Sequence, residues 1–348
     1  MIVRSPFAFA PRASERDALL DMTRTATTSA SASSSAACAR ERRRSHCTHR
    51  AASRSRASAI ASSSKKRLEV ITFDLDDTLW PTTPVVNAAN EALIDWCTER
   101  LGQKFPKTPV VHAAMKLVRE ERDAQARARG DAAAEPMSYA AIRIAGAVRA
   151  ARACGIPEHD AVAVIARGYH LAWIPTRNDM ARRLVFPGVR EALASLREAY
   201  PNATIGSITN GFGSATGAGL GEFFDFEISA EALIDEHMVH GEMARKPHAY
   251  PFQLAMGIAC GEHGYSGDAD TWVHVGDDVL NDCYCAKQLD LRTVHVKDPN
   301  VNPYQSGGGA PYAETSMRGA VEADAASHVD GVVTHVRELP GLLSTWYA

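Results

Sequence analysis

Short apolar segments alternate with amphipathic segments along most of the chain after residue 65. Residues 68–73 form an apolar, β-branched run that stops at a group of acids, which predicts a buried strand. The same reasoning predicts further strands at 203–208, 226–228, 272–275, 293–296 and 331–333. The segments between them predict helices at 189–200, 250–256, 281–288 and 336–343, and a Gly-rich loop at 302–310. Strands that alternate with helices favour a parallel sheet covered on both faces.

The stretch from residue 85 to residue 173 has no strand pattern. Ala, Arg, Glu and Leu dominate it, and Pro and Gly divide it into four predicted helices at about 85–101, 109–129, 138–153 and 158–173. Because the alternation of strands and helices resumes afterwards, we interpret this block as an insertion. The predicted fold is α/β: a Rossmann-like doubly wound parallel sheet, formed by 66–81 and 184–348, with an inserted α-helical cap domain at 82–183.

The charge of the chain is unevenly distributed. Residues 1–65 contain twelve Lys and Arg against four Asp and Glu, a net charge of +8, so the remainder carries −11 of the total of −3. This balance argues against nucleic acid as the main partner of the folded part. No run of about 18 apolar residues is present, so neither a membrane span nor a membrane partner is predicted.

The segment 22–64 is rich in Ser, Ala, Thr and Arg, and its only acidic residue is Glu41. It has no hydrophobic periodicity, so residues 1–65 are predicted to be a disordered N-terminal targeting segment. This composition is typical of an organelle transit peptide and favours a plastid (chloroplast) over a mitochondrion. The alternatives are a plain disordered tail on a cytoplasmic protein and a basic patch around Arg43.

Polar side chains gather where the predicted strands end. In an open parallel sheet, ligands bind beyond the carboxyl ends of the strands. Eight residues are therefore expected to converge on one pocket: Asp74, Asp76, Thr209, Asn210, Lys246, Asp277, Asp278 and Asp282.

Several carboxylates in one pocket require a cation, because two unit charges about 4 Å apart repel by about 4 kcal/mol near a protein surface. The ligand set contains only oxygen, which favours Mg²⁺ over zinc. Magnesium commonly takes one or two carboxylates together with a substrate phosphate. The sequence therefore predicts Mg²⁺ as cofactor and a phosphate ester as substrate.

Four segments resemble the motifs of haloacid dehalogenase-like hydrolases, in the order of that family. Residues 74–79 resemble the D-x-D-x-T-L motif, and 208–211 are similar to the second motif, a strand ending in Thr or Ser. Residues 246–247 resemble the third motif, and 276–282 resemble the fourth, G-D-x-x-x-N-D. A single D-x-D is weak evidence, whereas four motifs in order across 68–343 are strong evidence.

The resemblance implies a role for each of the eight residues. Asp74 would be the nucleophile that becomes phosphorylated, and Asp76 would be the general acid and then the general base. Thr209, the Asn210 backbone and Lys246 would bind the phosphoryl group, with Lys246 also neutralising the nucleophile. Mg²⁺ would be held by Asp74, the backbone carbonyl of Asp76, and Asp277. Asp282 would not contact the substrate but would orient waters or Lys246, and Asp278 could do the same with less support.

The implied activity is Mg²⁺-dependent hydrolysis of a small-molecule phosphomonoester by a capped phosphatase. An acid at position 76 distinguishes the phosphatases of this superfamily from its dehalogenases. A phosphorylated ribityl-pyrimidine of riboflavin synthesis, or a sugar phosphate, is slightly favoured as substrate. Phosphoglycolate hydrolysis and phosphomutase activity are alternatives within the fold, and a phosphoacceptor signalling or binding module is an alternative of another class. Either a monomer or a homodimer is compatible with the sequence.

Other polar and aromatic residues near the motifs are expected to have structural roles. Thr78 is interpreted as a turn residue, and Arg177 as a hinge or rim residue at the end of the insertion. Four more are interpreted as packing, capping or rim residues: Trp80, His170, Trp173 and His248.

The composition of the first 65 residues generates a test of targeting. We expect a fluorescent protein fused to residues 1–70 to enter plastids when imaged in plant cells, because the segment is Ser-rich, Arg-rich and poor in acids. The same reporter without the segment is the control. A diffuse cytosolic signal would contradict the targeting hypothesis, and a mitochondrial signal would change only the destination.

Overall fold

The computed structural model describes residues 65–130, 137–235, 244–298 and 312–348. They belong to one compact unit that spans residues 62–348. Nearly all of the predicted targeting segment, and the loop predicted at 302–310, lie outside the described residues. In the described part, none of the helices combines the length and the apolar character that a membrane span requires.

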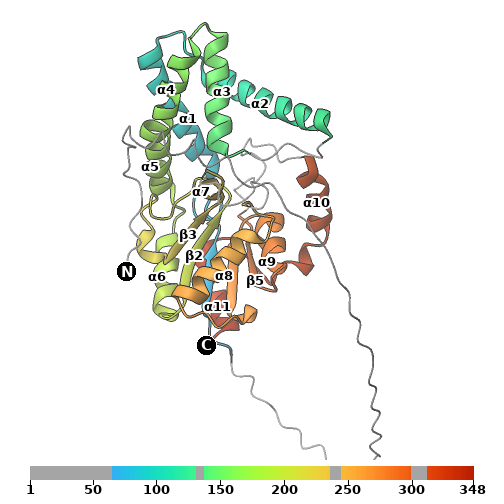
Figure 1. Ribbon diagram of the computed structural model, residues 1–348. Coiled ribbons are helices and arrows are strands. Elements are labelled where there is room, and N and C mark those ends of the chain that lie inside the picture. The colour runs from blue at the N-terminus through green and yellow to red at the C-terminus, as the bar shows by residue number, and fades with distance from the viewer. Residues whose placement is uncertain (1–64, 131–136, 236–243, 299–311) are drawn as a thin grey trace, which may run out of the picture. The chain divides into compact units, whose positions relative to one another are not determined.

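The centre of the fold is a six-stranded parallel sheet with the order β3-β2-β1-β4-β5-β6 (Figure 1). Each predicted strand is present, with ends that shift by no more than two residues. The strands are β1 Val70–Phe73, β2 Thr204–Thr209, β3 Phe226–Ser229, β4 Trp272–Gly276, β5 Arg292–Val296 and β6 Gly331–Val333. β1 lies between β2 and β4, so the strand order reverses at β1. An open parallel sheet binds ligands at this switch point.

The two faces of the sheet bury different side chains because successive strand residues point to opposite sides. Ile71 and Phe73 of β1 pack with helices α6 (Val189–Ala199) and α11 (Leu339–Trp346). Val70 packs on the opposite side with α8 (Tyr250–Glu262) and α9 (Cys285–Lys287). The α/β fold predicted from the sequence is confirmed.

A block of helices is inserted between β1 and β2 and has a hydrophobic core of its own (Figure 1). Its helices are α1 Thr82–Leu101, α2 Thr108–Arg129, α3 Tyr139–Ala153, α4 Glu158–Gly168 and α5 Ile174–Leu184. A π-helical turn, Tyr169–Trp173, joins α4 to α5. The sequence did not predict α5, because Pro175 and the polar residues after it resemble a helix stop. Proline is nevertheless tolerated in the first turn of a helix, which is where Pro175 stands.

The remaining elements differ from the prediction in detail. Helix α8 continues six residues past the predicted end at 256, because its glycines Gly257 and Gly261 weakened the sequence pattern without ending the helix. The segment predicted as one helix at 281–288 is a π-helical turn, Val279–Tyr284, followed by α9. Two helices were not predicted, α7 (Ala230–Asp235) and α10 (Tyr312–Ala323). Short 3₁₀ turns occupy Gly221–Phe223, Ala269–Thr271, Ala325–Ser327 and Val336–Glu338.

Packing under the sheet generates a stability prediction. Leu193 of α6 is fully buried in the cluster that contains Ile71 and Phe73. We expect Leu193→Ala to lower the free energy of unfolding, measured with urea, by about 2–5 kcal/mol, because it leaves a cavity. Leu171→Ala is the matched control, since this leucine is 53% exposed and should tolerate the change. Equal losses in both variants would contradict the assignment of Leu193 to the core.

Candidate active site

The residues predicted to converge lie at the carboxyl end of the central strands. Asp74 follows β1, Thr209 ends β2, and Asp277 follows β4. Strand pairing sets Phe73 beside Ser207 on one side and Val275 on the other, so the polar residues that follow these strands share one edge of the sheet. The edge coincides with the point where the strand order reverses.

Lys246 is the centre of this group. Its side chain is 2% exposed, and its Nζ donates hydrogen bonds to Asp74 Oδ1 at 2.7 Å, Asp282 Oδ1 at 2.6 Å and the carbonyl of Ile208 at 2.8 Å. An ammonium group has three donors, so all three have partners. Lys246 therefore offsets part of the negative charge of the carboxylates around it.

Burial and charge pull the pKa values of this group apart. Burial raises the pKa of Asp74 to about 8, against the attraction of Lys246. Burial alone would also raise the pKa of Asp282, but Lys246 and a hydrogen bond from His274 lower it. Burial alone would lower the pKa of Lys246, but Asp282 and Asp74 raise it. These shifts favour the charged forms of Lys246 and Asp282. The charge of Lys246 does not fully offset the effect of burial on Asp74.

Asp277 completes a cluster that fits a cation. Carboxylate oxygens of Asp74, Asp277 and Asp282 lie within 4.8 Å of one another. Burial raises the pKa of Asp277 well above its ordinary value, and the charges of Asp282 and Asp74 raise it further. The hydroxyl of Thr78 donates to Asp277 Oδ1 at 3.2 Å, so Thr78 contacts the site as well as stabilising the turn. The donor set contains only oxygen, and one ammonium stands among three carboxylates, so the cluster suits a hard divalent cation.

Asp278 has structural partners. Its Oδ1 accepts hydrogen bonds from the backbone N–H groups of Leu280 and Asn281, which caps the π-helical turn after β4. Arg318 of α10 pairs with the same carboxylate at 2.9 Å. The carboxylate of Asp278 is therefore directed away from the cluster and towards the chain that follows.

Thr209 and Asn210 organise the end of β2. Thr209 is 3% exposed, and its hydroxyl oxygen accepts from the backbone N–H of Gly211 at 3.2 Å. The amide of Asn210 forms two hydrogen bonds of 2.8 Å with the backbone N–H and C=O of Lys246. This pairing fixes the backbone of Lys246 against β2 and explains how its side chain reaches Asp74.

Asp76 is held by two residues that the sequence interpretation treated as structural. Arg177 of α5, expected at a hinge or rim, is 2% exposed, and its Nη2 donates to Asp76 Oδ1 at 2.7 Å and Oδ2 at 2.8 Å. The indole Nε1 of Trp80 donates to Asp76 Oδ1 at 2.8 Å. Trp80 is fully buried, so its packing role is accompanied by a direct contact with the motif. The contact of Arg177 with Asp76 could not be predicted, because the helix that carries Arg177 was not predicted.

A series of hydrogen bonds between buried side chains ends at Asp282 and orients its carboxylate. The indole of Trp272 donates to the hydroxyl of Thr72 at 3.0 Å, and Thr72 lies 2.9 Å from Nδ1 of His274. His274 Nε2 lies 3.3 Å from Asp282 Oδ1. Burial lowers the pKa of His274, so a neutral ring that accepts from Thr72 and donates to Asp282 satisfies both nitrogens. A period-2 pattern places Trp272 and His274 on one face of β4, but only the structure shows that the chain ends at Asp282.

A second contact joins the helical insertion to the sheet. Glu231 of α7 is fully buried, and its Oε2 accepts from the backbone N–H of Ala140 at the start of α3. Its Oε1 accepts from Arg245, whose guanidinium lies 4.3 Å from the ring centroid of Tyr139. The start of α3 is therefore attached to the residue that precedes Lys246.

The remaining residues expected to be structural have structural positions. Trp173 is 2% exposed in the core of the insertion and donates to Asn90. The His248 ring accepts from the N–H of Tyr250 at the start of α8, and His170 is exposed.

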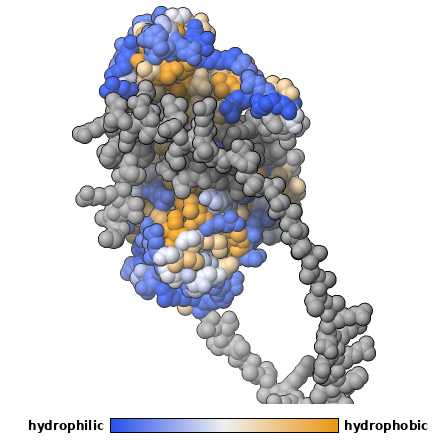
Figure 2. All heavy atoms as spheres, in the orientation of Figure 1, coloured by the Kyte–Doolittle hydropathy of each residue, from blue (hydrophilic) through white to orange (hydrophobic). Residues whose placement is uncertain are grey.

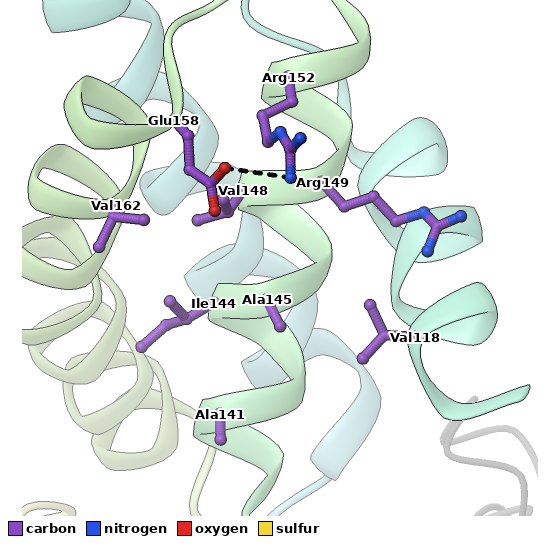
Figure 3. Close-up of a pocket in the computed structure, with 9 residues that line it drawn as sticks. All are labelled: Val118, Ala141, Ile144, Ala145, Val148, Arg149, Arg152, Glu158 and Val162. Atoms are coloured by element: carbon purple, nitrogen blue, oxygen red, sulfur yellow. Dashed lines mark ion pairs between the residues drawn. The ribbon is translucent and has the colours of Figure 1, made fainter. Parts of the chain in front are cut away.

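An apolar groove of about 580 Å³ lies elsewhere, among α2, α3 and α4 (Figure 3). Val118, Ile144 and Val162 line it, and the ion pair of Arg152 with Glu158 crosses one end. None of the eight predicted residues lines it. On the face shown in Figure 2, hydrophilic residues lie at the edges of the visible part of the insertion, and apolar residues lie between them.

Comparisons with known proteins agree with the motifs. The family model described as a haloacid dehalogenase-like hydrolase matches residues 68–290. A 2-haloacid dehalogenase from Pseudomonas syringae pv. Tomato DC3000 is 24% identical with a TM-score of 0.55, over 80% of this chain and 99% of its own, which shows a shared fold. A magnesium-bound hydrolase from Bacillus subtilis is 16% identical with a TM-score of 0.47, over 80% of this chain and 100% of its own. A predicted phosphoglycolate phosphatase from Haemophilus somnus 129pt is 16% identical with a TM-score of 0.45, over 79% and 98%. No curated protein matches the chain.

The hydrogen bonds of Lys246 generate a stability prediction. We expect Lys246→Met to lower the free energy of unfolding in EDTA by about 3–5 kcal/mol, because it leaves buried carboxylates without their counter-charge. Lys66→Met is the matched control: Lys66 also pairs with two carboxylates, Asp268 and Asp270, but its side chain is 48% exposed. Urea unfolding of both variants should show a large loss only for Lys246→Met. Similar losses would mean that burial is not what makes the Lys246 pairs important.

Proposed function

The chain belongs to the haloacid dehalogenase-like hydrolases, and we propose that it is a phosphatase of that family acting on a small phosphomonoester. The observation that carries the proposal is the placement of Asp74. Its carboxylate contacts a buried lysine at 2.7 Å, shares a cluster with Asp277, and lies two residues before a second carboxylic acid. A nucleophile, a charge-neutralising group and an acid are the parts that transfer of a phosphoryl group from an oxygen ester requires.

Mg²⁺ is the proposed cofactor. Asp74 and Asp277 would hold it together with the backbone carbonyl of Asp76, because Asp282 is already engaged by Lys246 and His274. When bound, it would offset the negative charge of the carboxylates and of the phosphate.

The residues of the chain account for two chemical steps. An oxygen of Asp74 attacks phosphorus and forms an aspartyl-phosphate, while the bond to the leaving oxygen breaks and Asp76 gives that oxygen a proton. Asp76 then takes a proton from water, whose oxygen attacks phosphorus, and the bond to Asp74 breaks to release inorganic phosphate. Thr209 and the backbone of Asn210, at the end of β2, would bind phosphoryl oxygens during both steps. Lys246 favours the ionised form of Asp74 and orients its carboxylate through their hydrogen bond.

We propose that the helical insertion, residues 82–183, is a cap over a core formed by 66–81 and 184–348. Two contacts hold the insertion against the core in this structure: Arg177 with Asp76, and Glu231 with the start of α3. A cap excludes water from the reaction and selects the leaving group of the substrate.

Asp76 is also what favours a phosphatase over a dehalogenase. A carbon–halogen bond needs no proton donor for its leaving group, whereas an ester oxygen does. The contacts with Arg177 and Trp80 hold the Asp76 carboxylate in one position, which supports its proposed role as the acid.

The substrate is proposed only by class. A phosphorylated ribityl-pyrimidine or a sugar phosphate is the first candidate, and phosphoglycolate is the second. Tyr169 and Trp173 stack on each other with ring centroids 4.9 Å apart and are almost fully buried. They are therefore part of the helical core, and the preference for a flat pyrimidine gains no support from them. A comparison of kcat/KM on these three compounds, with hexose phosphates to detect phosphomutase activity, would rank the candidates.

The proposed nucleophile generates a direct test. We expect Asp74→Asn to abolish release of phosphate from p-nitrophenyl phosphate, since an amide oxygen is a poor nucleophile. Asp270→Asn, an exposed acid of the same type, should leave the rate unchanged. The same preparations should release no halide from 2-haloacids. Halide release that depends on Asp74 would identify a dehalogenase, and a stable phosphoprotein without turnover would identify a phosphoacceptor module.

Metal dependence is a separate prediction. Activity should disappear in EDTA and return with Mg²⁺, and excess Ca²⁺ should inhibit, because calcium prefers more ligands at longer distances. Asp277→Ala should raise the Mg²⁺ concentration needed for half-maximal activity. Full activity in EDTA would contradict the assignment of these carboxylates to a metal.

A further inference from the structure

We propose that Arg177 is a positioning residue for Asp76 and that it makes acid–base catalysis depend on the seating of the helical insertion. The proposal rests on the proposed phosphatase function. Arg177 lies on α5 in the insertion, 101 residues after Asp76 in the chain, yet its guanidinium contacts both oxygens of that carboxylate. The side chain of Arg177 is 2% exposed and that of Asp76 is 20% exposed, so the arginine is buried while the carboxylate stays partly accessible.

The contacts leave one position on Asp76 for a proton. A carboxylate has two acceptor sites on each oxygen. Oδ1 accepts from Trp80 Nε1 and from Arg177 Nη2, which occupies both of its sites. Oδ2 accepts only from Arg177 Nη2, so one site on Oδ2 remains among the hydrogen bonds of the described residues. We infer that Oδ2 is the oxygen that carries the proton to the leaving group.

The surroundings of Oδ2 agree with this inference. A Cβ built on Gly211 would lie 2.7 Å from Oδ2, so the backbone that follows β2 lies directly against this oxygen. Thr209 and Asn210, the proposed phosphate-binding residues, immediately precede Gly211. Oδ2 therefore faces the segment on which the phosphate would lie, and Oδ1 faces Trp80.

Arg177 can hold this geometry because α5 is packed closely on the core. A Cβ on Gly213 would lie 3.3 Å from Arg177 Nη2, and a Cβ on Gly217 would lie 2.6 Å from the side chain of Asn178. Small residues in the segment after β2 thus allow α5 to approach. A displacement of the insertion would carry Arg177 away and leave Asp76 with Trp80 alone.

The test compares two substrates that differ in their need for a proton donor. p-Nitrophenyl phosphate releases a stable anion without help, whereas phenyl phosphate, nearly the same in shape, releases a much more basic one. We expect Arg177→Met to lower kcat/KM on phenyl phosphate by about 10²-fold, the range of general acid catalysis, and on p-nitrophenyl phosphate by less than about 10-fold. We compare kcat/KM because it reports the step that expels the leaving group, whereas hydrolysis of the aspartyl-phosphate, in which Asp76 is the base, is the same for both substrates. Trp80→Phe, which keeps the ring and removes the N–H, should show a smaller effect of the same kind. Arg177→Lys should recover part of the rate on phenyl phosphate. If Arg177→Met does not fold, Arg177→Lys and Trp80→Phe still test the proposal.

Two controls separate positioning from a general structural role. Arg182→Met removes an exposed arginine from the same helix, one that also pairs with a carboxylate, and should change neither substrate. In an Asp76→Asn background, Arg177→Met should produce no further loss on phenyl phosphate, because the group that it positions has gone.

Three results would overturn the inference. Equal losses of kcat/KM on both substrates would indicate a structural role if kcat falls, and a role in substrate binding if only KM rises. Losses that add in the Asp76→Asn background would show that Arg177 acts elsewhere. If Asp74→Asn is inactive in the same assays, any of these results defeats the role of Arg177 alone. Activity that survives Asp74→Asn would defeat the proposed function itself.

Discussion

The structure around the site depends on one buried ammonium group. Lys246 satisfies its three donors with Asp74, Asp282 and the carbonyl of Ile208, so a single side chain joins the ends of three chain segments. A buried charge is costly unless it is paired and fully hydrogen-bonded, and here it is both. The same arrangement leaves Asp74 and Asp277 with more negative charge than one lysine can offset. The excess negative charge suits the cluster to a divalent cation, and the proposed Mg²⁺ would offset it.

Support for Lys246 comes from the regular geometry of the sheet. Alternation along β1 and β4 places Thr72, Trp272 and His274 on the face covered by α8, and these residues form the hydrogen-bonded chain that ends at Asp282. A neutral His274 can donate to Asp282 and keep its oxygen directed at Lys246. The amide of Asn210 holds the Lys246 backbone from the other side. Core residues of ordinary appearance thus determine where the charged groups lie.

The sequence predicted the parallel sheet and its strands because short apolar, β-branched runs that alternate with helical segments are local patterns. It also predicted where acids and the lysine would meet, since strand ends and motif order are readable from the chain. It did not predict α5, because Pro175 resembles a helix stop, and so it could not place Arg177 beside Asp76. Thr78 and Trp80 were interpreted as a turn residue and a packing residue, yet both donate hydrogen bonds to carboxylates of the motifs. Thr78 and Asp277 are 199 residues apart, so only tertiary packing brings them together. Trp80 is four residues after Asp76, but this spacing alone does not show that the turn directs the indole N–H at the carboxylate.

The division of labour between core and insertion follows from which groups each contributes. The core alone supplies Asp74, Lys246 and Asp277, so the proposed nucleophile and its lysine partner need no residue of the insertion. The acid Asp76 is also a core residue, but one of its two partners belongs to the insertion. Attachment of α3 through Glu231 and Arg245, next to Lys246, gives the insertion a second fixed point close to the site. A group that receives its orientation from both parts of the chain is fully held only when the two parts are together, so the proposed proton transfer by Asp76 would be fastest in that arrangement.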